Sequence, residues 1–350
     1  MQRIILPIIA LGLAITIQSC KKNDNNNYDV PTIYNFTDVD YSGQTYRLTM
    51  LTELSTEMKK GNTSGVVVDA TILKEMYANL NNRFSNDTLN TSGKQLKDKT
   101  ITTEQSVIDG YLDAHALASQ SVSAGSNGTA GVVQVGTAKY LFNANGQEYT
   151  QLVEKGLFGS LIYYQIASVY LSSDKMGTQV ALADRQHHWD EAFGYFGVPT
   201  DFPANVTGIK FIGKYCNDRN ALLSTNAAIM DAYLKGRAAL NNGDEETVSE
   251  QISIIRDNIE KVLASTAIHY INEALANATN DAVRNHSLSE GIAFARALRF
   301  SPTKKVTDIQ LNQIDTYFSG NFYTVSTTDL QAAKDLLSTI FGFDSVKDQL

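Results

Sequence analysis

The sequence predicts an all-α protein built as two packed helical bundles behind a lipid-anchored flexible tether. Three observations support this fold class: apolar residues recur at helical spacing along most of the chain, only 5 of 350 residues are proline, and no internal repeat is visible. Long periodic segments with few prolines disfavour a β-sandwich or a barrel. A chain of this length has room for two bundles of about 150 residues each.

The composition narrows the class of function. Lys and Arg number 29 against 37 Asp and Glu, which gives a formal net charge of -8. Because phosphate backbones are bound by clustered Lys and Arg, we expect no nucleic-acid partner. With 43% hydrophobic and 19% charged residues, the chain is neither disordered nor embedded in a membrane. Its 2 cysteines are too few for a disulfide framework.

Residues 1–19 are predicted to be a signal peptide. Arg3 supplies a positive charge, and residues 4–17 are apolar apart from one Gly and one Thr. This run is shorter than the about 20 residues that a membrane-spanning helix needs. It ends in Ser19 and Cys20, which resembles a bacterial lipobox. Cys20 is therefore expected to carry a lipid; the alternative is an ordinary signal peptide followed by a chance cysteine.

The polar segment 20–31 is expected to be a tether between the lipid and the folded part. The mature protein would then be anchored to a membrane without spanning it. We expect the protein to be located in the cell envelope of a Gram-negative bacterium, at the outer membrane. The sequence does not indicate whether it faces the periplasm or the cell surface.

An N-terminal bundle is predicted over residues 32–197 and a C-terminal bundle over 221–350. Between them, Pro199, Pro203 and two glycines indicate a connector at 198–220. A loop is expected at 121–130, which is rich in Ser, Gly and Ala, and a short strand at 132–135. Helices are expected at 48–58, 69–84, 103–120, 147–172, 179–195, 221–241, 245–278, 281–298, 306–318 and 328–341.

The helix that begins at Glu245 carries the clearest pattern. A stripe with alternating spacings of four and three runs from Val248 to Glu273, aliphatic at first and then polar at Thr266, His269 and Glu273. These polar side chains continue the face that the aliphatic ones bury. Buried polar groups need hydrogen-bond partners, so we expect other residues to meet them inside the protein.

Three His–Glu pairs stand at helical spacing. They are His188–Glu191, His269–Glu273 and His286–Glu290. Residues three or four apart share a helix face, so each pair can direct an imidazole and a carboxylate into one space. Both groups suit iron, manganese or zinc. His187, Asp190 and Asp184 lie on the same predicted helix as the first pair and are possible accessory ligands.

Two interpretations stay open for each pair. The residues are either metal ligands or acid–base partners, or they form a structural network or surface pair. If all three pairs meet at one point, the functional interpretation is favoured; if they are scattered, the structural one is. The only tryptophan, Trp189, is expected to be a packing anchor, and His115 a helix-face residue without a role in a site.

The segment 186–197, with His188 and Glu191, resembles the Gly-x-His-x-x-Glu signature of imelysin-like proteins, although Gln186 stands where that signature has its glycine. The resemblance implies two helical bundles, a lipid-anchored or periplasmic location and an association with iron uptake. More closely, the chain is similar to a family of helical envelope lipoproteins. The matching segments are His-His-Trp-Asp-Glu at 187–191, Gly-Arg-Ala-Ala at 236–239, and those at 269–273 and 286–291.

We therefore expect an envelope binding protein, for a metal ion (iron foremost, zinc as another candidate) or for a component of a metal-uptake system. The second expectation is a structural or interaction lipoprotein whose His–Glu pairs only stabilise the bundles. The third is a metal-dependent hydrolase. No His-Glu-x-x-His zinc motif occurs in the sequence, and no catalytic residue is assigned.

Overall fold

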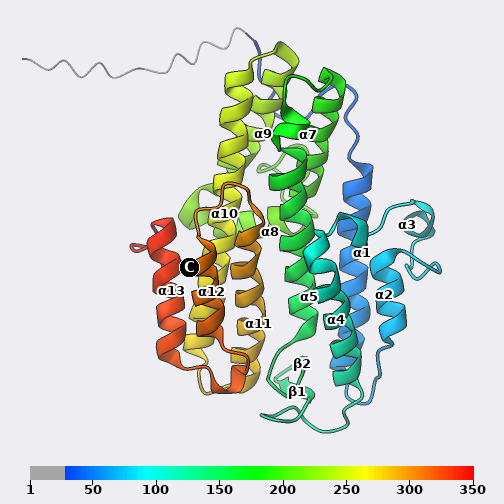
Figure 1. Ribbon diagram of the computed structural model, residues 1–350, viewed down its shortest axis with the longest axis vertical. Helices are drawn as coiled ribbons and strands as arrows, with labels where there is room; N and C mark the ends of the chain where they lie inside the picture. The colour runs from blue at the N-terminus through cyan, green and yellow to red at the C-terminus, as the bar shows by residue number, and fades with distance from the viewer. Residues whose placement is uncertain (1–27) are drawn as a thin grey trace, which may run out of the picture.

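The computed structural model describes residues 28–350. The predicted signal peptide, the lipidation site Cys20 and most of the predicted tether lie outside the described residues. Within residues 28–350 the chain is helical apart from one small hairpin, which confirms the predicted all-α class (Figure 1). No helix in this part of the chain is both long enough and apolar enough to cross a membrane.

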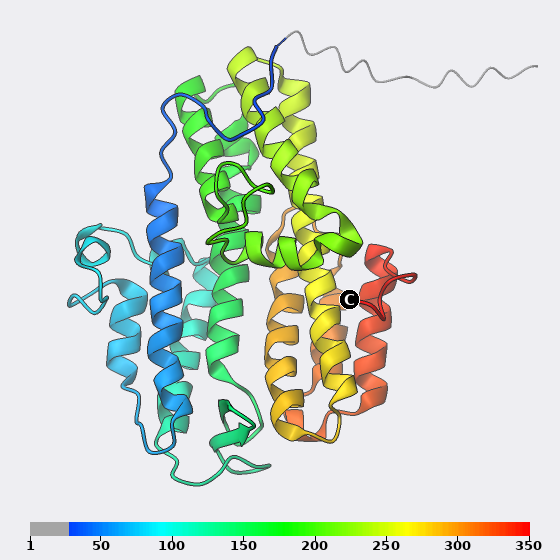
Figure 2. The same cartoon turned by 180° about the vertical axis from the view of Figure 1, so that it is seen from behind.

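The first group of helices lies on one side of the molecule (Figures 1 and 2). It contains α1 (Ser42–Lys59), α2 (Ala70–Ala78), α4 (Thr102–Ser119) and α5 (Tyr149–Leu157), with the short elements η1 (Lys60–Asn62), α3 (Asp87–Thr91) and η2 (Lys97–Lys99) between them. α1 packs against α2 and α5, and α4 packs against both α2 and α5. The predicted helices at 48–58 and 103–120 are confirmed.

α2 ends well before the predicted boundary at residue 84. Asn79 adopts a left-handed conformation, with φ of 49°, and its side-chain amide donates to the carbonyls of Leu89 and Lys94. Asparagine tolerates this backbone geometry, which stops a helix. Leu80, which follows the end of this helix, is 55% exposed.

A two-stranded antiparallel sheet follows α4. β1 (Gly131–Val135) pairs with β2 (Ala138–Phe142), and Val132 lies opposite Leu141. The turn includes Gly136, whose φ of 58° suits a residue without a side chain. The predicted strand at 132–135 is confirmed, whereas β2 was not predicted from the sequence.

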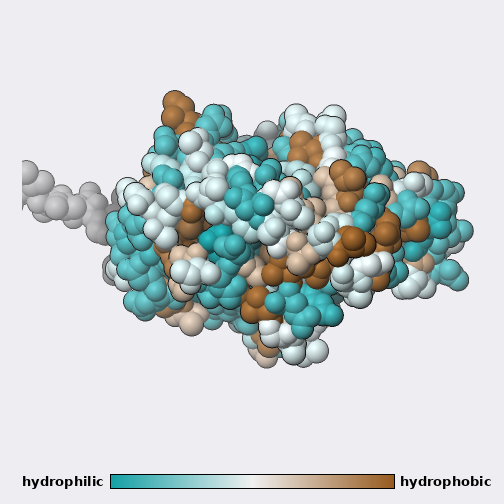
Figure 3. Space-filling view, turned by 90° about the horizontal axis from the view of Figure 1, so that it is seen from below, coloured by the Kyte–Doolittle hydropathy of each residue, from teal (hydrophilic) through white to brown (hydrophobic). Residues whose placement is uncertain are grey.

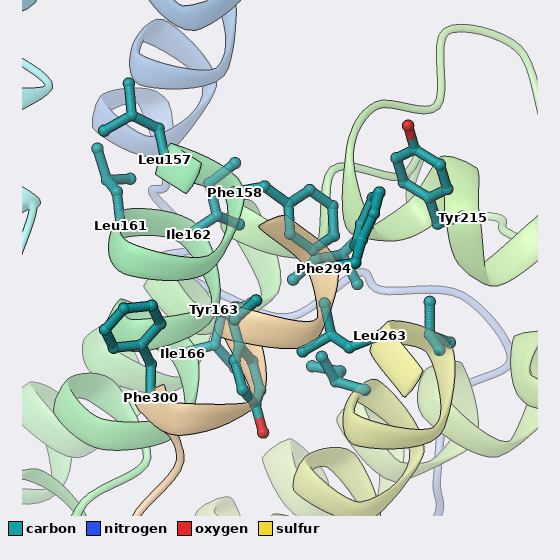
Figure 4. Close-up of a cluster of buried hydrophobic side chains, with 14 of the residues drawn as sticks. Leu157, Phe158, Leu161, Ile162, Tyr163, Ile166, Tyr215, Leu263, Phe294 and Phe300 are labelled. Carbon is teal, nitrogen blue, oxygen red and sulfur yellow. The ribbon is translucent and has the colours of Figure 1, made fainter. Parts of the chain in front are cut away.

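α5 continues as η3 (Phe158–Tyr163) and η4 (Gln165–Tyr170), two segments of π-helix that complete the long helix predicted at 147–172. Their side chains form the centre of the hydrophobic core (Figure 4). Gly159 faces the next helical layer so closely that an added Cβ would lie 2.6 Å from the Cβ of Ala297. A small residue is therefore needed where this helix meets residue 297.

The next helices are α6 (Ser173–Met176), α7 (Leu182–Phe196), α8 (Ile212–Leu223) and α9 (Thr225–Asn242). In Figure 1, α7 and α9 form the upper part of the molecule, and α8 lies near its middle. Helix α8 begins at Ile212, inside the segment 198–220 that was expected to be a connector, so the last residues of that segment are helical. Gly213 is not a turn residue: an added Cβ would lie 2.3 Å from Val198, which shows that it permits close packing. The proposed boundary between two bundles stays a prediction.

The remaining helices pack side by side on the opposite side from α1 and α2 (Figure 2). They are α10 (Glu245–Ala276), α11 (Asp281–Ala297), η5 (Leu298–Phe300), α12 (Asp308–Phe318), η6 (Phe322–Thr324) and α13 (Thr327–Phe341). α10 packs on α9, α11 and α13, and α11 packs on α5. The predicted stripe on α10 is buried from Val248 to Thr266, and the last two positions, His269 and Glu273, are partly buried.

The surface of the end opposite the N-terminus is mixed. Seen from below, hydrophilic residues cover most of it, with separate groups of hydrophobic residues between them (Figure 3). Single exposed apolar side chains of this kind are normal in globular proteins. This end therefore gives no reason to place the candidate site there, and the polar groups beside the helices need to be considered instead.

Candidate functional site

The three predicted His–Glu pairs lie in two places. The ring of His188 lies 6.0 Å, between centroids, from that of Tyr170, at the end of the long helix 149–170. His286 contacts Glu148, which immediately precedes the start of the same helix. A helix of this length spans roughly 30 Å at 1.5 Å per residue. The three pairs therefore do not meet at one point, which is the arrangement that would have favoured the functional interpretation for all of them.

The first place is the α7 group, which we define as His187, His188 and Glu191. His188 Nδ1 lies 3.0 Å from Glu191 Oε2, and His187 Nε2 lies 3.8 Å from the same oxygen. Gln44 donates to the other carboxylate oxygen at 2.8 Å and also to the Tyr170 hydroxyl at 3.2 Å. His187 is half-exposed, while His188 and Glu191 are mostly covered. Two imidazoles thus share one carboxylate oxygen at a position that solvent can reach.

The two predicted accessory aspartates lie on different sides of α7. Asp184 is exposed, one turn before His187. Asp190 is 1% exposed and accepts hydrogen bonds from Arg237 Nε at 2.9 Å and from the Tyr34 hydroxyl at 2.5 Å. Burial raises the pKa of Asp190, although both partners act against this rise. The structure therefore gives Asp190 a place in the interior and not among the ligands.

Trp189 is buried completely, and its indole nitrogen donates to the carbonyl of Tyr233 on α9 at 3.0 Å. The prediction of a packing anchor is confirmed. Asp190 and Arg237 connect the same two helices. Some residues of the segments 187–191 and 236–239 therefore have a structural role, because they form the contact between α7 and α9.

The second place is the α11 group, which we define as Glu148, His286 and Glu290. His286 Nδ1 lies 2.6 Å from Glu148 Oε2, and its other ring nitrogen lies 3.7 Å from Glu290 Oε1. Burial lowers the pKa of His286, but the hydrogen bond and the charge of Glu148 outweigh burial, so that this pKa is raised. Glu148 was missed in the sequence because it precedes His286 by 138 residues.

A buried lysine, also missed, belongs to the surroundings of the α11 group. Lys155 Nζ lies 2.5 Å from Glu154 Oε1 and 4.0 Å from Glu290 Oε1. Burial lowers the pKa of Lys155, but the charges of Glu290 and Glu154 raise it by more than burial lowers it. The amine therefore stays protonated. Burial also raises the pKa of Glu154, yet Lys155 and Ser55 bring it down to about 2. Glu290 thus already has a buried cation within 4.0 Å.

The pair on α10 is divided between neighbours. Glu273 accepts a hydrogen bond from the Ser287 hydroxyl on α11 at 3.2 Å. Burial, and then the nearby positive charge of Arg219, lower the pKa of His269. The stripe on α10 predicted that both side chains face the interior; they are only partly buried, and their partners come from other elements. Glu273 lies toward the α11 group: burial raises the pKa of Tyr140, and the charges of Glu148, Glu273 and Glu290 raise it further.

Within residues 28–350, no three or more His, Cys, Asp or Glu side chains are already arranged to hold a metal ion. In the α11 group the two ring nitrogens of His286 face different carboxylates. An ion bound at one nitrogen would therefore lie beside only one of the two carboxylates. In the α7 group both imidazoles face the same oxygen. The α7 group is therefore nearer to a ligand set than the α11 group.

The fold and these two groups define a helical-bundle protein with His–Glu clusters at its helix contacts. The chain belongs to the family described as a domain of unknown function (DUF4856), whose model matches residues 33–321. This match includes α1 to α12 and every residue of the α7 and α11 groups. No curated protein and no solved structure matches the chain.

Proposed function

We propose that this protein is a cell-envelope lipoprotein that binds a metal ion, iron foremost, and that the α7 group is where it binds. The observation that carries the proposal is the position of Glu191 Oε2, which lies 3.0 Å from one imidazole nitrogen and 3.8 Å from another. Metal–nitrogen and metal–oxygen bonds of about 2.0–2.2 Å place neighbouring ligand atoms roughly 3 Å apart. In the proposed bound state the half-exposed His187 moves to that spacing.

The surroundings of the α7 group support this role. Gln44 holds the free oxygen of the Glu191 carboxylate, as outer partners commonly do for metal-binding carboxylates. Asp184, one turn earlier on the exposed side of α7, is available as a further ligand. His188 and Glu191 are also the residues that carry the resemblance to imelysin-like proteins, which are associated with iron uptake. A component of an uptake system would reach the group from the same exposed side.

The envelope location rests on the N-terminal sequence. The signal peptide 1–19 and the lipid on Cys20 would bind the mature chain to a membrane, which we propose to be the outer membrane. The chain enters the fold next to the α9–α10 turn, where the Tyr28 hydroxyl donates to Asp244 at 2.9 Å. Labelling the producing cells with palmitate tests the anchor, since Cys20→Ala should abolish incorporation and leave the protein free of the membrane fraction.

For the α11 group a structural role is favoured by one specific observation. Lys155 lies within 4.0 Å of Glu290 and is almost fully buried, so the carboxylate already has a positive partner. Glu148 and His286 then connect the start of α5 to α11. The second expected function, stabilisation of the helical bundles by His–Glu contacts, therefore applies to this group. A metal-dependent hydrolase would instead use the α7 residues to activate water through a bound ion.

Metal titration separates these functions. The mature chain, with Cys20→Ser to keep it without lipid, is freed of metal and titrated with Fe(II) under anaerobic conditions and with Zn(II) by calorimetry. We expect micromolar binding that is lost in His188→Ala and in Glu191→Gln and retained in the matched variant His286→Gln. Binding should also weaken below about pH 6, because imidazole must be unprotonated to ligate.

The thermal unfolding midpoint of each variant is measured alongside. Affinity no better than millimolar in the parent protein, or equal affinity in His188→Ala and the parent, would contradict the proposal. Inertness of the metal-loaded protein toward peptide and ester substrates would count against the hydrolase.

A further inference from the structure

Arg219, on α8, differs from the other arginines in having no bonded partner. Every other arginine within residues 28–350 donates at least one hydrogen bond to a carbonyl or carboxylate oxygen. Arg219 donates none to the described part of the chain, although its side chain is partly buried and its Nε is completely covered. A guanidinium carries five N–H donors, and a covered donor without an acceptor costs free energy. An acceptor supplied by a ligand would remove this cost.

Glu273, on α10, is a carboxylate without a cationic partner. The Ser287 hydroxyl donates to its Oε2 at 3.2 Å, and no Lys, Arg or His of the described chain forms a salt bridge with it. Both charges act on His269, one turn before Glu273. Burial lowers the pKa of His269, the charge of Arg219 lowers it further, and the charge of Glu273 raises it. An unpaired cation and an unpaired anion therefore lie near one imidazole without bonding to each other.

The packing of α8 on α10 and α11 produces this arrangement. Tyr215, one turn before Arg219 on α8, has its ring centroid 4.7 Å from that of Phe294 on α11. Tyr270 on α10 stacks with the same Phe294 at 5.9 Å, and His269 packs edge-on against Tyr270 at 5.2 Å. Figure 4 shows Tyr215 at the edge of the hydrophobic cluster, with its hydroxyl directed away from the cluster. Aromatic rings therefore lie beside the two unpaired charges.

The two charges restrict the kind of ligand. A ligand with only a carboxylate would bind Arg219 but be repelled by Glu273, and one with only an ammonium group would meet the reverse. Asp218, next to Arg219 in the sequence, does not supply the missing anion, because its carboxylate accepts from Lys214 Nζ at 2.7 Å. A molecule that carries one charge of each sign satisfies both groups.

We propose that Arg219 and Glu273 bind a free α-amino acid with an apolar side chain. Its carboxylate accepts from the Arg219 guanidinium, whose planar donors match carboxylate geometry, and its ammonium group donates to Glu273. Its side chain lies against the ring of Tyr270. Arg219, Glu273 and Tyr270 are only partly buried, so the ligand reaches them from solvent without a closed cavity. The proposal is independent of metal binding, because the α7 group shares no residue with this site.

Calorimetry with three probes of matched size tests the proposal on the mature Cys20→Ser chain. L-phenylalanine carries both charges, 3-phenylpropanoate lacks the ammonium group, and 2-phenylethylamine lacks the carboxylate. We expect L-phenylalanine to bind at least about tenfold more tightly than either of the other two. Thermal unfolding in the presence of L-phenylalanine should show a matching rise in midpoint.

Three variants give the test its controls. Arg219→Gln should weaken L-phenylalanine at least about tenfold. It should leave the unfolding midpoint of the free protein nearly unchanged, because no bond within the protein is lost. Lys214→Gln removes a cation from the same helix that is bonded to Asp218, and should leave the affinity unchanged. Glu273→Gln should weaken L-phenylalanine but strengthen 3-phenylpropanoate, since the repulsion of its carboxylate is removed.

Several outcomes would overturn the proposal. They are equal affinity for L-phenylalanine and either analogue, unchanged affinity in Arg219→Gln, an equal loss in Lys214→Gln, and no binding of L-phenylalanine at millimolar concentration. The last outcome would mean that water alone fills the space between Arg219 and Glu273.

Discussion

The six-membered ring of Trp189 lies directly on Gly236, so closely that a Cβ at residue 236 would stand 2.2 Å from two of the ring atoms. Real Cβ atoms do not approach other carbons to this distance. The contact joins α7 to α9 in the interior, where neither helix can move without disturbing the buried aromatic residues around Tyr233. Glycine is therefore required at 236 for a packing reason, although it lies within a helix.

Gly236→Ala is expected to destabilise the protein by about 2–3 kcal/mol, because overpacking a rigid core forces side chains and backbone apart. Urea unfolding measures the change. Gly110→Ala is the matched control: Gly110 also lies within a helix, but an added Cβ there would meet no atom within 4 Å. That substitution should stabilise the protein by about 0.5–1 kcal/mol. Equal effects of the two substitutions would contradict the assigned contact.

Arg237→Leu is expected to lower the free energy of unfolding by about 3–5 kcal/mol, because it leaves the carboxylate of Asp190 buried without a positive partner. Asp190 and Arg237 are 1% and 2% exposed, so water cannot replace the lost partner. Adding Asp190→Asn to the variant should recover part of the loss. Additive losses from the two single substitutions, measured by denaturant unfolding, would show that the pair is not coupled.

We expect the protein to lose stability in mild acid because of His115. It is fully buried on α4, and its Nε2 lies 2.8 Å from the carbonyl of Met58 at the end of α1. Burial lowers its pKa from 6.5 to about 4. The unfolded chain therefore binds a proton between these values while the native state does not. Stability from this residue is complete above pH 6.5 and falls as the pH drops toward 4.

The total loss in the free energy of unfolding is about 3 kcal/mol, because each pKa unit corresponds to about 1.36 kcal/mol. His115→Gln, whose amide can still donate to Met58, should remove most of the drop in unfolding free energy between neutral and acidic pH. His187→Gln, at a half-exposed histidine, should leave the pH dependence nearly unchanged. A parent-like acid dependence in His115→Gln would disprove the assignment to this residue.

Glu148→Gln should lower the pKa of His286, because the carboxylate hydrogen bond and charge that raise it are removed while burial stays. NMR titration of the imidazole nitrogens measures this shift directly. The sign for stability follows from the raised pKa. The contribution of the pair is present below the unfolded pKa of about 6.5 and is lost as the pH rises through the higher native pKa.

Glu273→Gln is the control for that titration, since Glu273 bonds to Ser287 and not to His286. It should shift the pKa of His286 less than Glu148→Gln does. A larger shift from Glu273→Gln would mean that the charge around His286 is arranged differently from the contact described above.

Much of the fold could be predicted because helical periodicity is a local property. The stripe from Val248 to Thr266 predicted both the existence and the buried face of α10. The errors fell where one residue type serves two purposes. Gly213 was interpreted as part of a connector, but it permits close packing against Val198. The helix expected to reach residue 84 ends at Ala78, because Asn79 adopts a left-handed conformation.

The sequence by itself determined the helical class, most of the helix positions and the packing role of Trp189. It also placed each imidazole one turn from a carboxylate, because that relation depends only on spacing along one helix. Only the tertiary structure decided which groups meet between helices. Glu148 reaches His286 across 138 residues, Lys155 neutralises Glu290, and Asp190 faces Arg237 in the interior. These contacts depend on how whole helices pack against one another, which no local pattern records.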